Sequence, residues 1–515
     1  KVMLIRTYSC ALMGVAAIPI TIEVDIEIGV NFYLVGLPDS AVKESQQRID
    51  TALRCHNYRI PGKKIVINMA PADIRKEGSA YDLTIAIGIL IASEQIKGVN
   101  KVEDYYIMGE LSLDGTLQPI RGALSVAIEA KKRGKRGIIL PAQNAREAAI
   151  VADIEVLGAH NIKEVIDFFN EEKEIERITI NTREEFQRSL NNYEFDFSDV
   201  KGQENIKRAL EIAAGGGHNV ILIGPPGSGK TMLAKRLPSI LPPLTLHEAL
   251  ETTKIHSVAG KMSRYSSLIS IRPFRAPHHT ISDVALVGGG SNPQPGEISL
   301  AHNGVLFLDE LPEFKRTVLE VMRQPLEDRF VTIARSKYSV DFPASFMFIA
   351  AMNPCPCGNY NHPKIPCTCG QGLVQKYLNK VSGPLMDRID IHVEVIPVTH
   401  EELASTKPVE KSEEIRKRVI KARAIQNKRF VEYERIHCNA QMSRKQVEQY
   451  CRISVEGEKL LKTAMERLGL SARAYDRILK VARTIADLEE SPEIEIEHLS
   501  EAINFRSLDR DNWGK

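Results

Sequence analysis

Residues 218–231 read His218-Asn219-Val220-Ile221-Leu222-Ile223-Gly224-Pro225-Pro226-Gly227-Ser228-Gly229-Lys230-Thr231, an apolar run that leads into the pattern Gly-x-x-x-x-Gly-Lys-Thr. Such a run before a glycine-rich turn predicts a buried β-strand followed by a phosphate-binding loop. Glycines let the backbone curl so that successive N–H groups point at phosphate oxygens, with the positive end of the following helix behind them. The sequence therefore predicts a P-loop.

The P-loop pattern gives a role to each of its polar residues. Lys230 is expected to reach the β- and γ-phosphates, and Thr231 is expected to ligate Mg²⁺. A chance turn between a strand and a helix is the alternative, and the completeness of the pattern argues against it. We therefore predict that ATP contacts Gly224, Pro225, Pro226, Gly227, Ser228, Gly229, Lys230, Thr231 and Met232.

Length and composition limit the classes of protein to which the chain can belong. The chain has 515 residues, too many for one hydrophobic core, and about three domains are expected. The formal net charge is +2, so any contact with nucleic acid must come from local basic patches. The longest apolar run, residues 83–92, has about half the length that a membrane-spanning helix needs. Residues 11–20 faintly resemble a signal-peptide core, but the strict alternation of residues 22–28 predicts a strand of a folded, cytoplasmic protein.

The N-terminal part, residues 1–170, alternates strand-like and helix-like patterns. The order and spacing of residues 75–86, 108–115 and 119–123 resemble the proteolytic domain of Lon-type proteases, an α+β domain. Such peptidases use a Ser/Lys dyad, in which the lysine deprotonates the nucleophilic serine. Aligned without gaps, the serine position falls on Ala80 and the lysine position on Leu124, and neither side chain can do this chemistry.

The N-terminal part is therefore expected to be a Lon-like domain without the protease, used for assembly or for contact with DNA. An active protease, with Ser79 as its nucleophile, is the alternative. Residues 171–195 are polar and lack periodicity, so they predict an inter-domain linker.

A second apolar strand, residues 304–308, ends in Asp309 and Glu310. The first carboxylate of such a pair belongs to the Mg²⁺ shell, and the second can polarise the attacking water. An exposed acidic strand end is the alternative. The pair follows a complete P-loop by about eighty residues, on a strand too apolar for the edge of a sheet. We therefore assign these roles to Asp309 and Glu310.

Three further residues could complete a catalytic site. A third apolar strand, residues 346–352, ends at Asn353, which could hold the attacking water or sense the γ-phosphate. Arg388 is the candidate for an arginine finger, which in a ring would enter the site of the neighbouring subunit, and Arg473 could contact the γ-phosphate from a lid. Each arginine alone is more often a partner in a surface ion pair. Their order after the first two motifs favours the catalytic roles.

Together these motifs resemble those of the magnesium chelatase-like group of AAA+ ATPases, and within it the ComM/YifB family. The resemblance covers nearly the whole chain and includes residues 272–279, 295–302 and 506–510. It implies a ring, expected to be a hexamer, that hydrolyses ATP with Mg²⁺ and moves on DNA, as in branch migration during natural transformation or recombination. Two alternatives remain, namely a chelatase-type motor subunit that remodels a protein partner and an ATP-dependent protease.

Two segments are candidates for contact with DNA. Two alternating runs flank Arg335-Ser336-Lys337 and predict a β-hairpin with a basic tip. In related rings such a hairpin points into the pore, where Arg335 and Lys337 would hold phosphates, although a solvated turn is the alternative. Residues 284–296 resemble the helix-2 insert of this group, a second candidate pore loop. We assign no catalytic role to His278 and His279, just before it.

Four of the eight cysteines form Cys-x-Cys, nine residues, Cys-x-Cys. Four thiolates so close together can close a tetrahedral structural Zn²⁺ site. The usual zinc spacing is Cys-x-x-Cys, so free thiols or a redox pair remain alternatives. The candidate ligands are Cys355, Cys357, Cys367 and Cys369.

The C-terminal part is expected to be helical, with helices over residues 413–430, 443–451, 456–468, 474–488 and 496–503. The predicted fold class is therefore α/β. A Lon protease-like α+β domain (1–170) and a linker (171–195) precede a P-loop AAA+ ATPase core (196–398) and a C-terminal helical lid (399–515).

Overall fold

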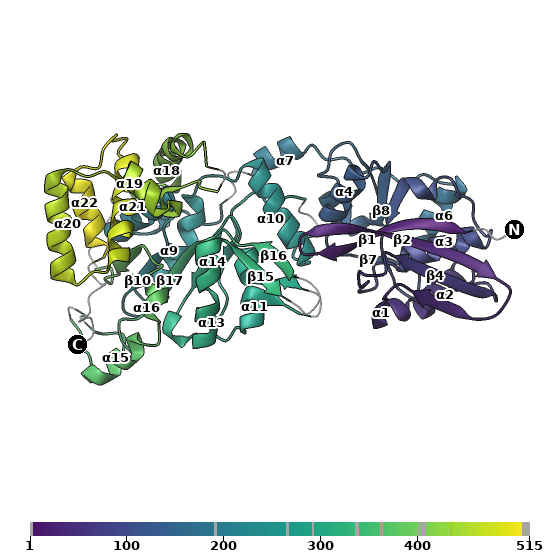
Figure 1. Cartoon of the computed structure of the whole chain (residues 1–515), viewed down its shortest axis with the longest axis horizontal. Helices are drawn as coiled ribbons and strands as arrows, with labels where there is room; N and C mark the ends of the chain where they lie inside the picture. Colours follow the sequence, from purple (N-terminus) through teal and green to yellow (C-terminus); the bar gives the residue numbers. More distant parts are fainter. Residues whose placement is uncertain are drawn as a thin grey trace.

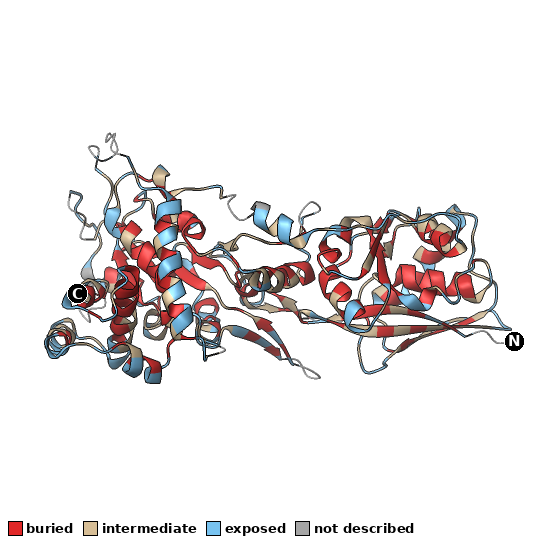
Figure 2. Cartoon of the chain, turned by 90° about the horizontal axis from the view of Figure 1, so that it is seen from above, coloured by how far each residue is buried: buried red, intermediate tan, exposed pale blue. Residues whose placement is uncertain are grey.

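A computed structural model of the chain describes residues 4–189, 193–263, 267–290, 293–334, 339–360, 364–399, 408–433 and 435–506, together with residues 362 and 402. The molecule is elongated, with the N-terminal strands at one end and the C-terminal helices at the other (Figure 1). Buried residues gather around two separate sheets (Figure 2). Every helix in the described ranges is too short or too polar to cross a membrane.

The N-terminal sheet is mixed, with its seven strands in the order β3-β4-β2-β1-β5-β8-β9. One of its helices, α3, is buried along almost its whole length, because it is apolar on every side. The strand predicted over residues 22–28 lies in β2, which begins earlier and pairs antiparallel with β1. The strands are β1 (Ile5–Met13), β2 (Ala16–Glu27), β3 (Phe32–Val35), β4 (Lys64–Ala70), β5 (Tyr105–Ile107), β8 (Gly137–Pro141) and β9 (Glu155–Ala159), with β6 (Glu110–Leu111) and β7 (Leu117–Gln118) outside this sheet. The helices are α1 (Ser40–Lys43), α2 (Ser45–Cys55), α3 (Asp82–Ala92), α4 (Ala123–Lys132), α5 (Ala142–Ala148) and α6 (Ile162–Asn170).

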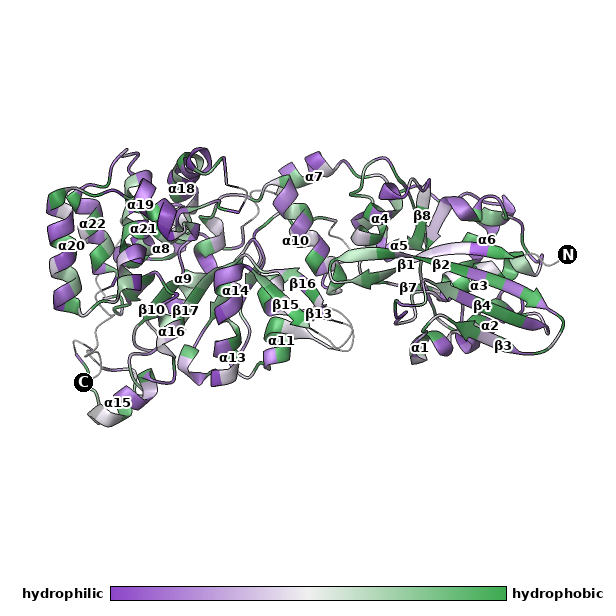
Figure 3. Ribbon diagram, viewed as in Figure 1, coloured by the Kyte–Doolittle hydropathy of each residue, from purple (hydrophilic) through white to green (hydrophobic). Residues whose placement is uncertain are grey.

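The second sheet has five parallel strands in the described residues, in the order β11-β14-β17-β10-β18. Alternate side chains enter two different hydrophobic clusters, so helices cover both faces, as a parallel sheet requires. The ribbons of β10 and β17 are green in Figure 3, the colour of hydrophobic residues. The mixed α/β fold class with a parallel sheet is thus confirmed, and β14, which precedes Asp309, is an interior strand as predicted. The strands are β10 (Val220–Ile223), β11 (Phe274–Arg275), β14 (Val305–Leu308), β17 (Met347–Met352) and β18 (Ile391–Glu394). The helices of this part are α8 (Glu204–Gly216), α9 (Lys230–Arg236), α10 (Leu246–Val258), α12 (Glu297–Leu300), α13 (Arg316–Val321), α14 (Arg323–Asp328), α15 (Gln371–Leu378) and α16 (Gly383–Met386).

Two small hairpins extend from the part of the chain that contains the parallel sheet. The predicted hairpin is confirmed, since β15 (Phe330–Ala334) pairs antiparallel with β16 (Ser339–Pro343). The predicted insert contains α11 (Asp283–Val287) and a two-residue pairing of β12 (Gly288–Gly289) with β13 (Gln294–Pro295). Figure 1 shows β15 and β16 on the side that faces the N-terminal sheet.

The C-terminal helices lie within two residues of their predicted positions. They are α18 (Ser412–Arg429), α19 (Arg444–Tyr450), α20 (Val455–Leu468), α21 (Ala472–Leu488) and α22 (Ile496–Asn504). The buried side of α21 shares one hydrophobic cluster with α8 and with one face of the parallel sheet. The helical part is therefore packed on the sheet that carries the P-loop.

The two halves of the molecule meet between α4 and α10. Leu124 of α4, Ala249 of α10 and Leu268 lie in one small hydrophobic cluster. The predicted linker is partly helical, because α7 (Thr182–Ser189) forms within it and Phe186 packs against the same cluster. The contact between the halves therefore includes a small apolar cluster.

Candidate nucleotide site

Three neighbouring strands of the parallel sheet end in polar residues at one edge. β10 leads into the loop 224–229, β14 into Asp309, and β17 into Asn353. Parallel strands bring their carboxyl ends to the same edge, which is where open α/β sheets bind ligands. The sheet therefore gathers predicted site residues that lie far apart in the sequence.

The loop after β10 has a backbone that requires glycine. Gly227 and Gly229 have positive φ angles of 76° and 89°, which disfavour any side chain. A Cβ atom on Gly224 would lie 2.3 Å from the carbonyl oxygen of Val395, closer than any real contact. The glycines of the pattern are thus explained by the shape of the loop. Met232 lies just beyond it in the first turn of α9 and is 40% exposed.

Lys230 is folded back on its own loop. Its Nζ donates to the carbonyl oxygens of Gly224 (2.7 Å) and Pro225 (2.8 Å) and lies 3.3 Å from Asn353 Oδ1. Burial lowers the pKa of Lys230, and the carboxylate of Asp309 opposes that shift. The structure therefore brings together the predicted phosphate ligand and the predicted sensor, with the ammonium group held by acceptors that a phosphate could replace.

Two oxygen atoms mark a place for a hard cation beside the loop. The Thr231 hydroxyl donates to Asp309 Oδ2 over 2.5 Å, across 78 positions of sequence. Mg²⁺ prefers a hydroxyl and a carboxylate of this kind and completes its shell with water and phosphate oxygens. The residues present therefore fit a Mg²⁺ ion bound together with a nucleotide.

Glu310 has a partner that the sequence reasoning missed. Its backbone is left-handed, with φ of 54°, and its carboxylate Oε2 lies 3.3 Å from Nδ1 of His279. The ring of His278 lies 4.1 Å from that of His279, centroid to centroid. The only signal in the sequence was the place of the histidines shortly after β11, the strand next to β14.

The two candidate arginines lie close to each other in the chain's fold. Arg388 donates to the carbonyl oxygen of Pro384 (2.6 Å) and pairs with Glu327. Arg473, at the start of α21, lies 3.2 Å from Asp387, the residue before Arg388. These partners of the two arginines, all among the described residues, lie outside the P-loop of this chain. The side chain of Arg473 is 70% exposed, so it is open to contact with another molecule.

The residues predicted to contact DNA, Arg335 and Lys337, lie outside the described residues. The strands that carry them, β15 and β16, are described and have one buried and one exposed face. On the exposed face Thr332 donates to Asp341 over 2.6 Å. The described residues therefore include the two strands of the hairpin, and its tip lies outside them.

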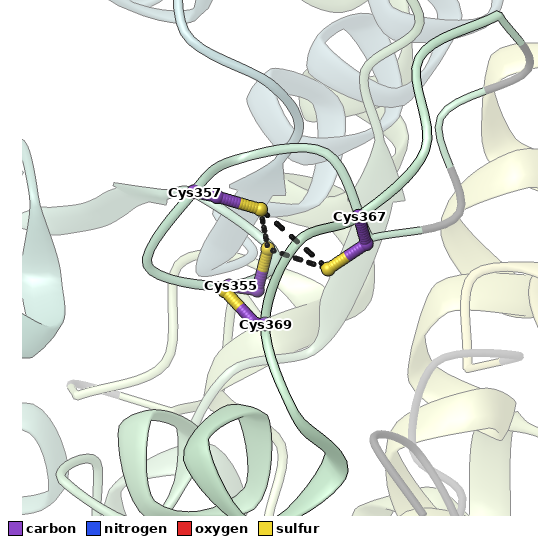
Figure 4. A group of neighbouring side chains, drawn as sticks. All are labelled: Cys355, Cys357, Cys367 and Cys369. Atoms are coloured by element: carbon purple, nitrogen blue, oxygen red, sulfur yellow. Dashed lines mark hydrogen bonds between the residues drawn. The ribbon is translucent and has the colours of Figure 1, made fainter.

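The four clustered cysteines converge at the end of β17 (Figure 4). Their sulfur atoms all lie within 4.8 Å of one another. Cys355 is fully buried, and the other three are half-buried. Hydrogen bonding to the backbone at Asn359 lowers the pKa of the Cys357 thiol to about 5. The cluster thus has the donor set of a metal site.

Ala80 and Leu124, the positions that the ungapped alignment gives to the Lon-type serine and lysine, lie just before α3 and on α4. The hydroxyl of Ser79 donates a hydrogen bond to the carboxylate of Glu110, so the group that it contacts is an acid. Leu124 is fully buried in the cluster between the two halves of the molecule. A Lon-like domain without the protease stays a prediction.

Comparison with known families gives three matches along the chain. The family described as magnesium chelatase, subunit ChlI, matches residues 196–403. A second family, described as subunit ChlI of Mg-chelatase, matches residues 22–144. A third, described as the C-terminal part of magnesium chelatase subunit ChlI, matches residues 409–506.

Two relatives named here match over almost the full length, and a third matches over part of the chain. Competence protein ComM of Haemophilus influenzae is 43% identical over 505 residues, which is 98% of this chain and 97% of the relative. The uncharacterized protein YifB of Escherichia coli is 44% identical over 502 residues, 97% of this chain and 96% of the relative. Lon protease 2 of Bacillus subtilis is 31% identical over 230 residues, which cover 38% of this chain and 40% of that protease.

Proposed function

Because this chain belongs to the magnesium chelatase-like family that includes ComM and YifB, we propose that it is an ATP-hydrolysing ring motor that acts on DNA. The observation that carries the ATPase is the meeting of Lys230, Thr231, Asp309 and Asn353 at the ends of three adjacent strands. Similarity to a competence protein over nearly the whole chain supports a role on DNA. Branch migration in natural transformation or recombination is the activity that we infer.

In the proposed mechanism the P-loop backbone and Lys230 bind the phosphates of ATP. Lys230 gives up its bonds to Gly224 and Pro225 when a phosphate oxygen takes their place. Thr231 and Asp309 would hold Mg²⁺, which would neutralise charge on the phosphates. Glu310 orients and polarises the attacking water, and Asn353, beside Lys230, senses the γ-phosphate.

The site is completed by a second copy of the chain. Arg388 and Arg473 have recorded partners outside the P-loop, and an arginine that stabilises the transition state is worth a factor of about 10³–10⁵ in rate. We propose that Arg388 enters the site of the neighbouring subunit, and that Arg473 contacts the γ-phosphate from the lid. A closed ring, a hexamer in this proposal, gives every site such a neighbour.

Each part of the chain has a place in this proposal. Residues 1–170 form a Lon-like domain without protease activity, 171–195 the linker, 196–398 the ATPase core and 399–515 the helical lid. The hairpin β15–β16 would carry Arg335 and Lys337 to DNA in the pore of a cytoplasmic ring. ATP, Mg²⁺ and a structural Zn²⁺ at the cysteines are the ligands that we infer.

One experiment tests the proposal against its rivals. ATP hydrolysis is measured with single-stranded, duplex and four-way-junction DNA, for the parent chain and for Arg335→Ala/Lys337→Ala. Stimulation by DNA in the parent, with loss of that stimulation in the variant, is expected. A parent that no DNA stimulates would contradict the proposal, and stimulation by a chelatase-type protein partner instead would favour that rival. Casein degradation that is lost in Ser79→Ala would favour a protease.

A further inference from the structure

The cysteine cluster has the dimensions of a metal site. A tetrahedron of sulfur atoms about 2.3 Å from a zinc ion has edges of about 3.8 Å. Cys355 Sγ lies 3.3 Å from Cys357 Sγ and 3.7 Å from Cys367 Sγ, and the last two are 3.5 Å apart. A disulfide bond is only about 2.0 Å long, and all four cysteines are free. The sulfur atoms are therefore arranged around a common centre and are not paired.

The chemistry of the four ligands selects the kind of metal. Thiolates favour soft or borderline ions, and a closed set of four sulfurs leaves no open position for catalysis. The backbone N–H of Tyr360 donates to Cys355 Sγ over 3.3 Å, which supports a negative charge on that sulfur. A structural Zn²⁺ fits these properties.

The loop that the cysteines close lies against the nucleotide site. Cys355 comes two residues after Asn353, whose Oδ1 contacts Lys230. Gly358 has a φ angle of +81°, and a Cβ atom there would lie 2.5 Å from Cδ of Pro226 in the P-loop. The backbone of the cysteine loop is thus in close contact with the phosphate-binding loop.

The loop needs a cross-link to hold this position. Between β17 and α15 the described residues form no helix or strand, and ordering such a segment costs conformational entropy at every residue. At the far end of the loop, Tyr377 of α15 packs in the same hydrophobic cluster as Met352 of β17. A metal bound by both cysteine pairs would fix the segment between these two anchors.

We propose that Cys355, Cys357, Cys367 and Cys369 bind one Zn²⁺, and that the metal-closed loop positions Pro226 and Asn353 for ATP. These cysteines are positioning residues, because they act through the P-loop and the asparagine. The inference rests on the proposed function only in taking the P-loop as an ATP site. It does not require that the protein act on DNA.

The first test measures the metal in the full-length protein, purified without chelator. Elemental analysis is expected to find one zinc per chain, and only a trace in Cys367→Ser/Cys369→Ser. Cys55→Ser is the matched control, because Cys55 is an exposed thiol of the N-terminal part, and it should keep its zinc. A parent protein that binds no zinc after incubation with zinc sulfate, with its four clustered thiols open to a thiol reagent, would overturn the proposal.

The second test measures the binding of a fluorescent ATP analogue without DNA. Without the metal, part of the loop must be ordered when the analogue binds, and the cost of ordering about one residue corresponds to about tenfold weaker binding in Cys367→Ser/Cys369→Ser. Gly358→Ala should keep its zinc and still bind the analogue more weakly, because its methyl group meets Pro226. This variant separates the effect of the loop from a failure to fold.

Unchanged binding of the analogue in both variants would overturn the inference, even with zinc present in the parent. Failure of the proposed function would give a different experimental result. If DNA does not stimulate hydrolysis but loss of zinc weakens ATP binding, the proposal of a motor on DNA is wrong. The proposal that zinc positions the ATP site is then retained.

Discussion

Nδ1 of His279 lies 3.3 Å from Oε2 of Glu310, the carboxylate that we assign to polarising water. The two residues follow β11 and β14, which are neighbours in the sheet. A carboxylate engaged by a histidine is less available to accept a hydrogen bond from water. The insert with α11 begins a few residues after His279, so a change in that insert could be passed to Glu310.

His279→Ala is expected to raise ATP hydrolysis measured without DNA. The contact is half-exposed, and even a charged pair so placed contributes about 1 kcal/mol at most, so the gain should not exceed about fivefold. The steady-state rate with and without DNA is the measurement, and the stimulation by DNA should shrink because the basal rate has risen.

His278→Ala is the matched control for this variant. Its ring stacks on His279, but its own recorded hydrogen-bond partner is Thr280, at 3.0 Å from Nδ1. The rate should therefore stay near that of the parent. A fall in the basal rate of His279→Ala would instead show that the histidine orients Glu310 for catalysis.

A mixture of two inactive variants tests whether Arg388 acts on a neighbour. Lys230→Ala lacks the phosphate ligand, and Arg388→Ala lacks the finger. In a mixed ring, an intact P-loop can face an intact Arg388 at about a quarter of the contacts, since each partner is chosen at random from equal amounts. We expect ATP hydrolysis in the mixture well above that of either variant alone.

The outcome depends on the rings exchanging subunits, so the mixture is checked by co-purification with a tag on one variant. Mixed rings that remain inactive would contradict an arginine supplied by a neighbour. A strictly monomeric preparation that hydrolyses ATP at the full rate would contradict it too.

Much of the fold could be predicted because its signals are local. The strands β10, β14 and β17 are short, wholly apolar runs, which is what burial on both faces of a parallel sheet demands. The C-terminal helices carry a clear helical period. The polar residues at the strand ends could be found for the same reason, because each follows an apolar run directly.

Other features depend on partners distant in the sequence. The contact of His279 with Glu310 follows from the order of the strands, which no local pattern gives. Helix α7 is polar apart from Phe186, which is partly buried against the cluster between the two halves of the molecule. The approach of Gly358 to Pro226 arises in the same way, from two loops that the sheet brings together.

Glu147 should make the contact between the two halves sensitive to pH. Burial raises the pKa of Glu147, although the Ser257 hydroxyl and the N–H of Leu124 donate to its carboxylate. The folded form therefore binds its proton more tightly than the unfolded chain, whose pKa is about 4.3. Its contribution to stability is complete below that value and is lost as the pH rises through the raised pKa.

Glu147→Gln should remove this dependence. Thermal unfolding is followed from pH 5 to pH 8, and the variant is expected to gain stability over the parent as the pH rises, because it has no proton to lose. Equal slopes for the parent and the variant would show that the carboxyl group keeps the same charge in the folded and unfolded states.

Asp390 joins the parallel sheet to the helical part and should be far more important for stability than the half-buried Asp387. Burial alone would raise its pKa, but Arg477 of α21 and His218 hold the pKa of Asp390 below its ordinary value. Its contribution is thus present above the unfolded pKa of about 3.9 and is lost only as the pH falls below it.

Asp390→Ala removes a buried carboxylate that pairs with the half-buried Arg477 and the buried His218, and it should cost about 3–5 kcal/mol in urea unfolding at neutral pH. Asp387→Ala is the matched control, because Asp387 also pairs with an arginine of α21. That partner, Arg473, is 70% exposed, so the loss should be about 1 kcal/mol or less. Equal losses in the two variants would mean that the buried pair is not what ties the helices to the sheet, since the two aspartates would then contribute alike despite their different burial.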